Sequence, residues 1–197
     1  MNQQLKNQGY LLVKHVLKPD IYNFLTHVLL RNQELKSGGD AQVADCLTTM
    51  FHDVMLDTVL EDVWPTLENI VDLDLLPTYA YARLYKNSNI LAKHVDRPAC
   101  EISLTIQLGR SHHYSWPIYM AGNRFDLAEG DGVIYLGSIV EHWREKCVGP
   151  EDYYSGQLFL HYVNANGLYH KEYADSTKRP NTGNLFVKHR NFLLTDK

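Results

Sequence analysis

The chain has 197 residues, of which 45% are hydrophobic and 21% are charged, as is ordinary for a globular protein with one sizeable core. Its formal net charge of −4 gives no electrostatic reason to expect a nucleic acid or a membrane as a partner. No apolar run approaches the roughly 20 residues of a membrane span. The start, MNQQLKNQGY, lacks a signal-peptide core, and the three cysteines form no CxxC pair, so we expect a cytoplasmic location.

The first 35 residues predict one strand and one helix. Residues 9–17 (GYLLVKHVL) form an apolar run that predicts a strand, and Pro19 with Asp20 supplies a helix start. The helix is predicted over 21–35, because apolar side chains and one histidine recur there at roughly helical spacing. These residues are Tyr22, Leu25, His27, Leu29 and Leu30.

Residues 36–42 (KSGGDAQ) predict a loop. A second helical region is predicted over 48–70, bent or restarted at Trp64-Pro65. We predict a single domain over residues 1–197, and residues 1–78 form its mostly helical part.

From Tyr79 onward the character changes to short alternating runs rich in aromatic and β-branched residues, which predict strands. The runs are 79–86, 101–109, 115–122, 125–137 and 156–164, with a loop at 176–184 before a last strand at 185–189. This pattern predicts an α+β or mainly β fold, in which helices buttress a β-sandwich or barrel at 79–197.

His94 and Asp96 stand two residues apart before a strand, and side chains at that spacing share one side of an extended chain. Ile102, Leu104, Ile106 and Leu108 then fall on one face, with Ser103, Thr105 and Gln107 on the other. The pair is either a surface hydrogen bond or two ligands of a metal ion. A third ligand would decide between these interpretations.

His142 is the candidate third ligand, 46 residues after Asp96 and downstream of a Gly130-Asp131-Gly132 turn. That interval holds four or five short strands, enough for the chain to return beside His94. Two histidines and one carboxylate suit non-haem Fe(II), because they leave positions open for a chelating cosubstrate and O₂.

On these residues the chain resembles the Fe(II)/2-oxoglutarate-dependent oxygenases, particularly their prolyl-4-hydroxylase-like branch. Their jelly-roll core, a double-stranded β-helix similar to that of cupins, carries an H-x-D motif and a later histidine. The resemblance covers roughly residues 79–163. It implies that His94, Asp96 and His142 are both catalytic residues and iron ligands, and that the cofactors are Fe(II), 2-oxoglutarate and O₂, with ascorbate as a further candidate.

The branch also implies which residues hold 2-oxoglutarate. Tyr85 stands nine residues before His94, where the branch often has a tyrosine that contacts the cosubstrate, and on an extended chain it shares a face with Arg83. An Arg or Lys usually follows the later histidine by nine or ten residues, but Glu151 and Asp152 occupy those positions.

Arg144 is the first candidate for the missing carboxylate anchor, since a guanidinium matches a carboxylate bidentately. Arg83 and Arg97 are alternatives for this role. Arg144 could equally be a solvated loop residue, and Arg97 could support the ligands.

Further cofactor-contacting candidates come from two strands. Thr105 and Gln107 lie on the polar face after Asp96, and His161 lies in the run LFLHYV. His161 is expected either to pack with one hydrogen bond or to bind the cosubstrate carboxylate.

The resemblance implies a hydroxylase that acts on an unactivated C–H bond, such as that of a prolyl or other peptide residue, and releases succinate and CO₂. A cupin-like metal-dependent enzyme that does not use 2-oxoglutarate and a non-catalytic binding module remain alternatives. The substrate, whether a peptide, a protein or a small molecule, and the oligomeric state are not determined by the sequence.

Overall fold

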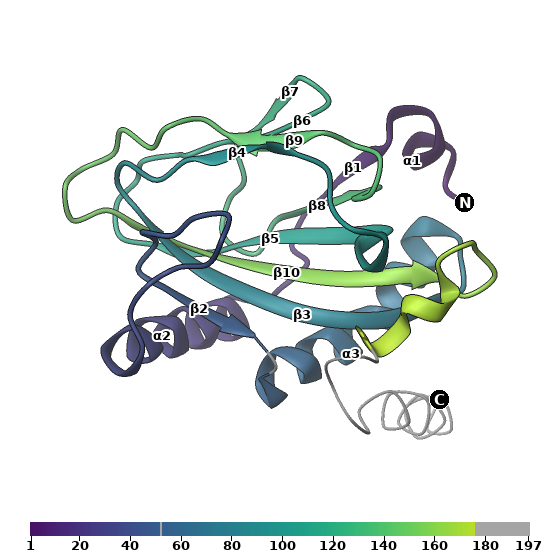
Figure 1. The fold of residues 1–197 in the computed structure, drawn as a ribbon, viewed down its shortest axis with the longest axis horizontal. Coiled ribbons are helices and arrows are strands. Elements are labelled where there is room, and N and C mark those ends of the chain that lie inside the picture. Colours follow the sequence, from purple (N-terminus) through teal and green to yellow (C-terminus); the bar gives the residue numbers. More distant parts are fainter. Residues whose placement is uncertain (52, 176–197) are drawn as a thin grey trace.

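A computed structural model describes residues 1–51 and 53–175 of the chain. Two antiparallel β-sheets face one another, and α2 and α3 lie against the outer side of the larger sheet (Figure 1). This arrangement confirms the predicted mainly β, jelly-roll class. The loop and strand predicted at 176–189 lie outside the described residues.

The helical segments are α1 (Gln3–Gln8), α2 (Pro19–Leu35), α3 (Val54–Val71) and the 3-10 segments η1 (Pro98–Cys100) and η2 (His170–Asp175). The strands are β1 (Tyr10–Val13), β2 (Thr48–Phe51), β3 (Leu75–Lys86), β4 (Leu91–His94), β5 (Ile102–Arg110), β6 (Ile118–Met120), β7 (Asn123–Phe125), β8 (Gly132–Tyr135), β9 (His142–Arg144) and β10 (Tyr154–Asn164). No helix in the described part of the chain is long and apolar enough to cross a membrane.

The predicted first helix is present, but its buried face differs from the prediction. Leu25 and Leu29 are buried in the core, whereas His27 is exposed, so its place in the apolar stripe was wrong. Thr26 is buried instead, and its hydroxyl accepts a 2.7 Å hydrogen bond from the backbone N–H of Gly109 on β5. The helix is thereby tied to the sheet through a polar contact that periodicity does not reveal.

The region predicted as a helix over 48–70 begins as a strand. Thr48–Phe51 pairs with β3 as an edge strand, and α3 starts only after Asp53, whose carboxylate accepts a 2.9 Å hydrogen bond from the backbone N–H of Met55. The helix then runs through Pro65 without restarting. Sheet pairing and capping therefore fix the boundary that apolar spacing alone misplaced.

The larger sheet has the strand order β1-β8-β5-β10-β3-β2, and the smaller has β4-β9-β6-β7. The predicted alternation on β5 is confirmed: Leu104 and Ile106 belong to the core beneath the sheet, while Ser103 and Thr105 are buried on the face toward the smaller sheet. The largest apolar cluster thus lies on the helix side, and the polar side chains of β5 face the smaller sheet, whose own residues Leu91, Ile118 and Met120 belong to two smaller apolar clusters.

The strand assignment around His94 needs a correction. His94 ends β4 in the smaller sheet, and η1 separates it from β5 in the larger sheet. The sequence suggested that His94 and Asp96 open the β5 strand, but they lie where the chain crosses between sheets. β4 and β9 were not predicted, and β7 only at Phe125, because none of these short strands lies within an alternating apolar run, whereas the equally short β1, β6 and β8 do.

The Gly130-Asp131-Gly132 turn anchors the N-terminal segment beside β8. Gly130 has φ +83°, and a Cβ there would lie 2.4 Å from the Leu17 carbonyl oxygen. The Asp131 carboxylate accepts hydrogen bonds from Lys14 Nζ at 2.7 Å and from the His15 backbone N–H at 3.0 Å. The motif therefore has a structural reason that is independent of any metal.

Candidate metal centre and cosubstrate pocket

The three predicted ligands come together between the sheets. His94 and His142 are directly paired across β4 and β9, and their ring centroids are 4.2 Å apart. The Nε2 atom of each ring lies 3.6 Å from Oδ1 of Asp96. All three ligand atoms lie within 4.8 Å of one another, so the fold makes one cluster from the H-x-D motif and the distant histidine.

Main-chain carbonyls fix the tautomers of both histidines. His94 Nδ1 lies 2.7 Å from the Ala92 carbonyl oxygen, and His142 Nδ1 lies 3.0 Å from that of Val140. Because a carbonyl only accepts, each Nδ1 carries the proton as donor and each neutral ring leaves a lone pair on Nε2. Both lone pairs therefore belong to the nitrogens nearest Asp96, as metal ligation requires.

Burial and the neighbouring groups shift the pKa values of the three side chains in different directions. Burial alone would raise the pKa of Asp96, but the imidazole of His94, 3.6 Å away, and those of His161 and His142 outweigh it and leave that pKa lowered. Burial would lower the pKa of His94, yet Asp96 and the Ala92 carbonyl leave it raised. For the more buried His142, burial dominates and the pKa is lowered.

Tyr135 supports the carboxylate from behind. Its buried hydroxyl on β8 donates a 3.2 Å hydrogen bond to Asp96 Oδ2, the oxygen that does not face the two histidines. Its ring also packs on His142, with centroids 4.7 Å apart. A single side chain thus holds two members of the cluster.

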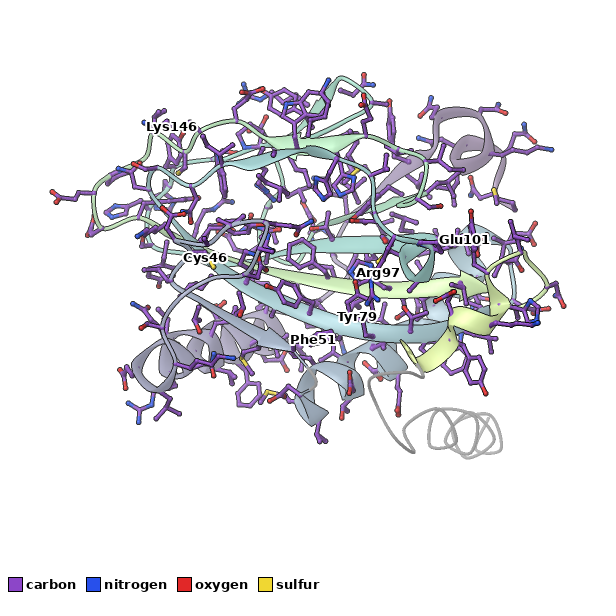
Figure 2. All side chains as sticks on the ribbon, viewed as in Figure 1. Cys46, Phe51, Tyr79, Arg97, Glu101 and Lys146 are labelled. Atoms are coloured by element: carbon purple, nitrogen blue, oxygen red, sulfur yellow. The ribbon has the colours of Figure 1, made fainter. Side chains whose placement is uncertain are left out.

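A cavity of about 610 Å³ opens from the cluster toward β2, β3 and β10. Aromatic rings line it: Phe51 packs edge-on against Tyr79 with ring centroids 5.3 Å apart, and Tyr81 packs at a tilt against Phe159 with centroids 5.8 Å apart. Arg97 lies over the Tyr79 ring at 4.7 Å, and Figure 2 shows Phe51, Tyr79 and Arg97 near one another. The space beside the cluster therefore has aromatic walls.

Arg83 supplies a cationic group to this cavity. Its side chain is 2% exposed. The guanidinium nitrogen NH2 donates to the Asp40 carboxylate and, at 3.0 Å, to Gln42 Oε1. Its NH1 donates to the Tyr85 hydroxyl at 2.7 Å, whereas its buried Nε has no hydrogen-bond partner among the described residues. The hydroxyl of Tyr81 also donates to Asp40.

Arg144, the first-choice anchor, lies outside the cavity lining. It is a buried residue of β9 rather than a solvated loop residue, and its NH1 donates to the Trp116 carbonyl. Its guanidinium carbon lies 4.9 Å from the Trp116 ring and 6.0 Å from the Tyr85 ring. Burial lowers the pKa of Arg144, and its Nε has no hydrogen-bond partner in the described chain.

Tyr85 lies between the two guanidiniums, buried and also outside the cavity lining. Thr105 and Gln107 face the interior as predicted, but they are outside the cavity lining and belong to a hydrogen-bond network with Gln157. Gln107 accepts from Gln157 Nε2 at 2.5 Å and donates to Ser155 Oγ at 2.9 Å. Neither Thr105 nor Gln107 is in the cavity lining, whereas Arg83 is, so Arg83 is the better placed to meet a ligand.

His161 lines the cavity and is 6% exposed. Its Nδ1 lies 2.8 Å from Ser103 Oγ, and burial lowers the pKa of His161 to about 4. The residue is packed with one hydrogen bond, as the first expectation has it, and binding of the cosubstrate carboxylate by this cavity-lining ring stays a prediction.

Sequence reasoning missed several residues of this site. Asp40 and Gln42 come from the predicted loop, whose sequence carries no functional signal. Tyr135 could have been placed by alternation along β8, but only pairing of β8 with β5 reveals that it faces inward. Cys100 lines the cavity because the crossing between sheets forms η1.

The fold is similar to that of solved oxygenases. A Pseudomonas putida prolyl-4-hydroxylase matches with a TM-score of 0.61 at 16% identity, over 80% of this chain and 95% of that one. The α-ketoglutarate-dependent non-haem epimerase SnoN of nogalamycin biosynthesis gives 0.64 at 11%, over 82% and 81%.

A Trichoplax adhaerens prolyl hydroxylase, solved with a hypoxia-inducible-factor peptide, gives 0.62 at 10%, over 88% and 89% of the two chains. No protein-family model and no curated protein matches the sequence. At these identities the likeness establishes the fold, which is the double-stranded β-helix of 2-oxoglutarate and Fe(II) oxygenases.

Proposed function

We propose that the protein is an Fe(II)- and 2-oxoglutarate-dependent dioxygenase that hydroxylates an unactivated C–H bond. The observation that carries this proposal is the convergence of two Nε2 lone pairs and one carboxylate at a cavity that also contains a buried guanidinium. The reaction is balanced as substrate, 2-oxoglutarate and O₂ giving hydroxylated substrate, succinate and CO₂.

The residues fit the metal. Two neutral imidazoles and one carboxylate match the preferences of Fe(II) and leave other positions of a six-coordinate ion for ligands. When bound, the ion supplies O₂ activation and chelation of the keto acid. His94, Asp96 and His142 would hold it, while the Ala92 and Val140 carbonyls keep the two imidazoles in the ligating tautomer.

We assign the distal carboxylate of 2-oxoglutarate to Arg83 rather than Arg144. Arg83 lines the same cavity as the three metal-ligand candidates, whereas Arg144 is outside its lining, and the Nε of each arginine has no hydrogen-bond partner among the described residues. Tyr85 holds one edge of the Arg83 guanidinium through its hydroxyl. The residue expected from the resemblance to contact the cosubstrate therefore acts through its arginine neighbour.

The aromatic walls favour a substrate that offers an aliphatic or ring C–H surface, such as a prolyl or other peptide residue. Phe51, 37% exposed at the end of β2, and Tyr79 would pack against such a group. The similar prolyl hydroxylases support this substrate class. Proline-containing peptides incubated with the complete system are expected to gain one oxygen atom, as measured by mass spectrometry.

The first test is anaerobic addition of Fe(II) and then 2-oxoglutarate. The wild-type protein is expected to develop the visible charge-transfer band of the iron chelate. Asp96→Ala should abolish this band because it removes the only carboxylate of the ligand set. His112→Ala is the matched control, since this partly exposed histidine pairs with Asp152 outside the cavity.

Fe(II) binding without the band on 2-oxoglutarate addition would support the cosubstrate-independent, cupin-like alternative. Absence of Fe(II) binding in a folded wild-type protein would support the non-catalytic module.

A further inference from the structure

A second group of metal-ligating side chains meets at Asp96. The carboxylate of Asp96, the thiol of Cys100 and the imidazole of His161 offer one ligand atom each, all within 4.8 Å of one another. They come from the crossing after β4, from η1 and from β10, and all three line the cavity. A metal ion that enters the cavity can therefore reach this group.

The imidazole of His161 is 6% exposed, and its Nδ1 lies 2.8 Å from Ser103 Oγ. The Ser103 hydroxyl has an acceptor in the Cys100 carbonyl oxygen at 3.0 Å, so its oxygen is able to accept a hydrogen bond from His161 Nδ1. In that arrangement the lone pair of the neutral ring lies on Nε2. A buried ring that is held in this way and lines a cavity is prepared for a ligand.

Cys100 changes the kind of metal that the group prefers. Its Sγ lies 3.1 Å from the Tyr79 hydroxyl, and burial raises the pKa of the thiol to about 12. The thiol is therefore protonated without a metal, and binding of one divalent ion releases one proton to solvent as the metal–sulfur bond forms. A thiolate with an imidazole and a carboxylate is a borderline-soft set, which Zn²⁺ accepts readily.

We propose that Asp96, Cys100 and His161 form a second divalent-metal site of the Zn²⁺ type, which shares Asp96 with the His94–Asp96–His142 cluster. Zinc bonds of about 2.0–2.3 Å bring tetrahedral ligand atoms to about 3.3–3.8 Å from one another. This site is independent of the proposed dioxygenase function, because it needs neither 2-oxoglutarate nor both histidines of the first cluster.

The test is anaerobic titration of the reduced full-length protein with Co²⁺, a spectroscopic substitute for Zn²⁺. One equivalent is expected to produce a near-ultraviolet thiolate-to-cobalt charge-transfer band, and added Zn²⁺ should remove it. Cys100→Ser should abolish the band, whereas Cys147→Ser should retain it, because Cys147 is equally buried but belongs to a different cluster. His161→Gln should raise the Co²⁺ concentration at half-saturation at least tenfold.

His142→Ala separates the two sites, because it removes a ligand of the first cluster alone. A band that persists in this variant supports a distinct site. Loss of the band in His142→Ala would mean that the thiol only joins a metal held by the first cluster, which overturns the proposal. No band in the wild type, or a band that survives in folded Cys100→Ser, overturns it as well, with folding checked by circular dichroism.

Discussion

Gln157 on β10 pairs with Arg83 on β3, so the two side chains face the interior at the same level of the larger sheet. β10 follows the strand of His142, and the sequence places no Arg or Lys there. The structure brings a guanidinium to this level from the neighbouring strand. β10 lacks an Arg or Lys, but antiparallel pairing places β3 beside it, so Arg83 supplies a cation at the same level of the sheet.

Arg83→Gln should raise the 2-oxoglutarate concentration that half-saturates the iron chelate band by roughly 10- to 100-fold. This factor corresponds to the loss of charge-assisted hydrogen bonds worth about 1.5–3 kcal/mol. Arg144 is also a buried arginine, but it is outside the cavity lining. Arg144→Met should therefore change that 2-oxoglutarate concentration less than threefold. The reverse ranking in folded variants would identify Arg144 as the anchor.

Asp40→Asn should tighten 2-oxoglutarate binding by roughly three- to tenfold, because it removes a negative charge that already contacts Arg83. Asp45→Asn is the control in the same loop. Asp45 accepts a 2.9 Å hydrogen bond from Asn89 and does not line the cavity. Weaker binding in Asp40→Asn would instead make Asp40 a residue that positions the guanidinium.

Tyr135→Phe should weaken Fe(II) binding roughly 10- to 100-fold, as the Asp96 carboxylate loses the hydrogen bond that orients it. Equilibrium dialysis of Fe(II) under argon measures the change. The Tyr119 ring stacks on Trp143, with ring centroids 5.3 Å apart. The control variant Tyr119→Phe is therefore expected to bind Fe(II) like the wild type. Equal affinities in all three proteins would remove Tyr135 from the metal-supporting residues.

Asp131→Asn should destabilise the fold by roughly 1–3 kcal/mol at pH 7, because a buried carboxylate loses its bond to Lys14. Burial would raise the pKa of Asp131, but Lys14 and backbone N–H groups leave it lowered. Stability from this group is therefore full above its unfolded pKa of about 3.9 and is lost as the pH falls through the lower folded value.

Denaturant unfolding at pH 7 and at pH 3 should consequently show a smaller difference between wild type and Asp131→Asn at the lower pH. Asp126→Asn is the control, because its partner Arg124 is exposed and such pairs contribute about 0–1 kcal/mol. A pH-independent difference between wild type and Asp131→Asn would show that charge is not the cause.

The sequence by itself determined the strand alternation and the three residues of the H-x-D and later-histidine pattern. Alternation is local, because neighbouring side chains on a strand necessarily point to opposite faces. Ser103, Thr105 and Gln107 were placed correctly for this reason. Helix α2 was likewise predicted from its proline start and apolar spacing.

Only the tertiary structure decided which cation meets the cavity and which other groups surround Asp96. Arg144 was the first candidate in the sequence and Arg83 an alternative, but β9 buries Arg144 against Trp116 while β3 directs Arg83 into the cavity. His161 reaches Asp96 because β10 pairs with β5. Such contacts depend on strand order and register, which join residues far apart in the chain and leave no local signal in it.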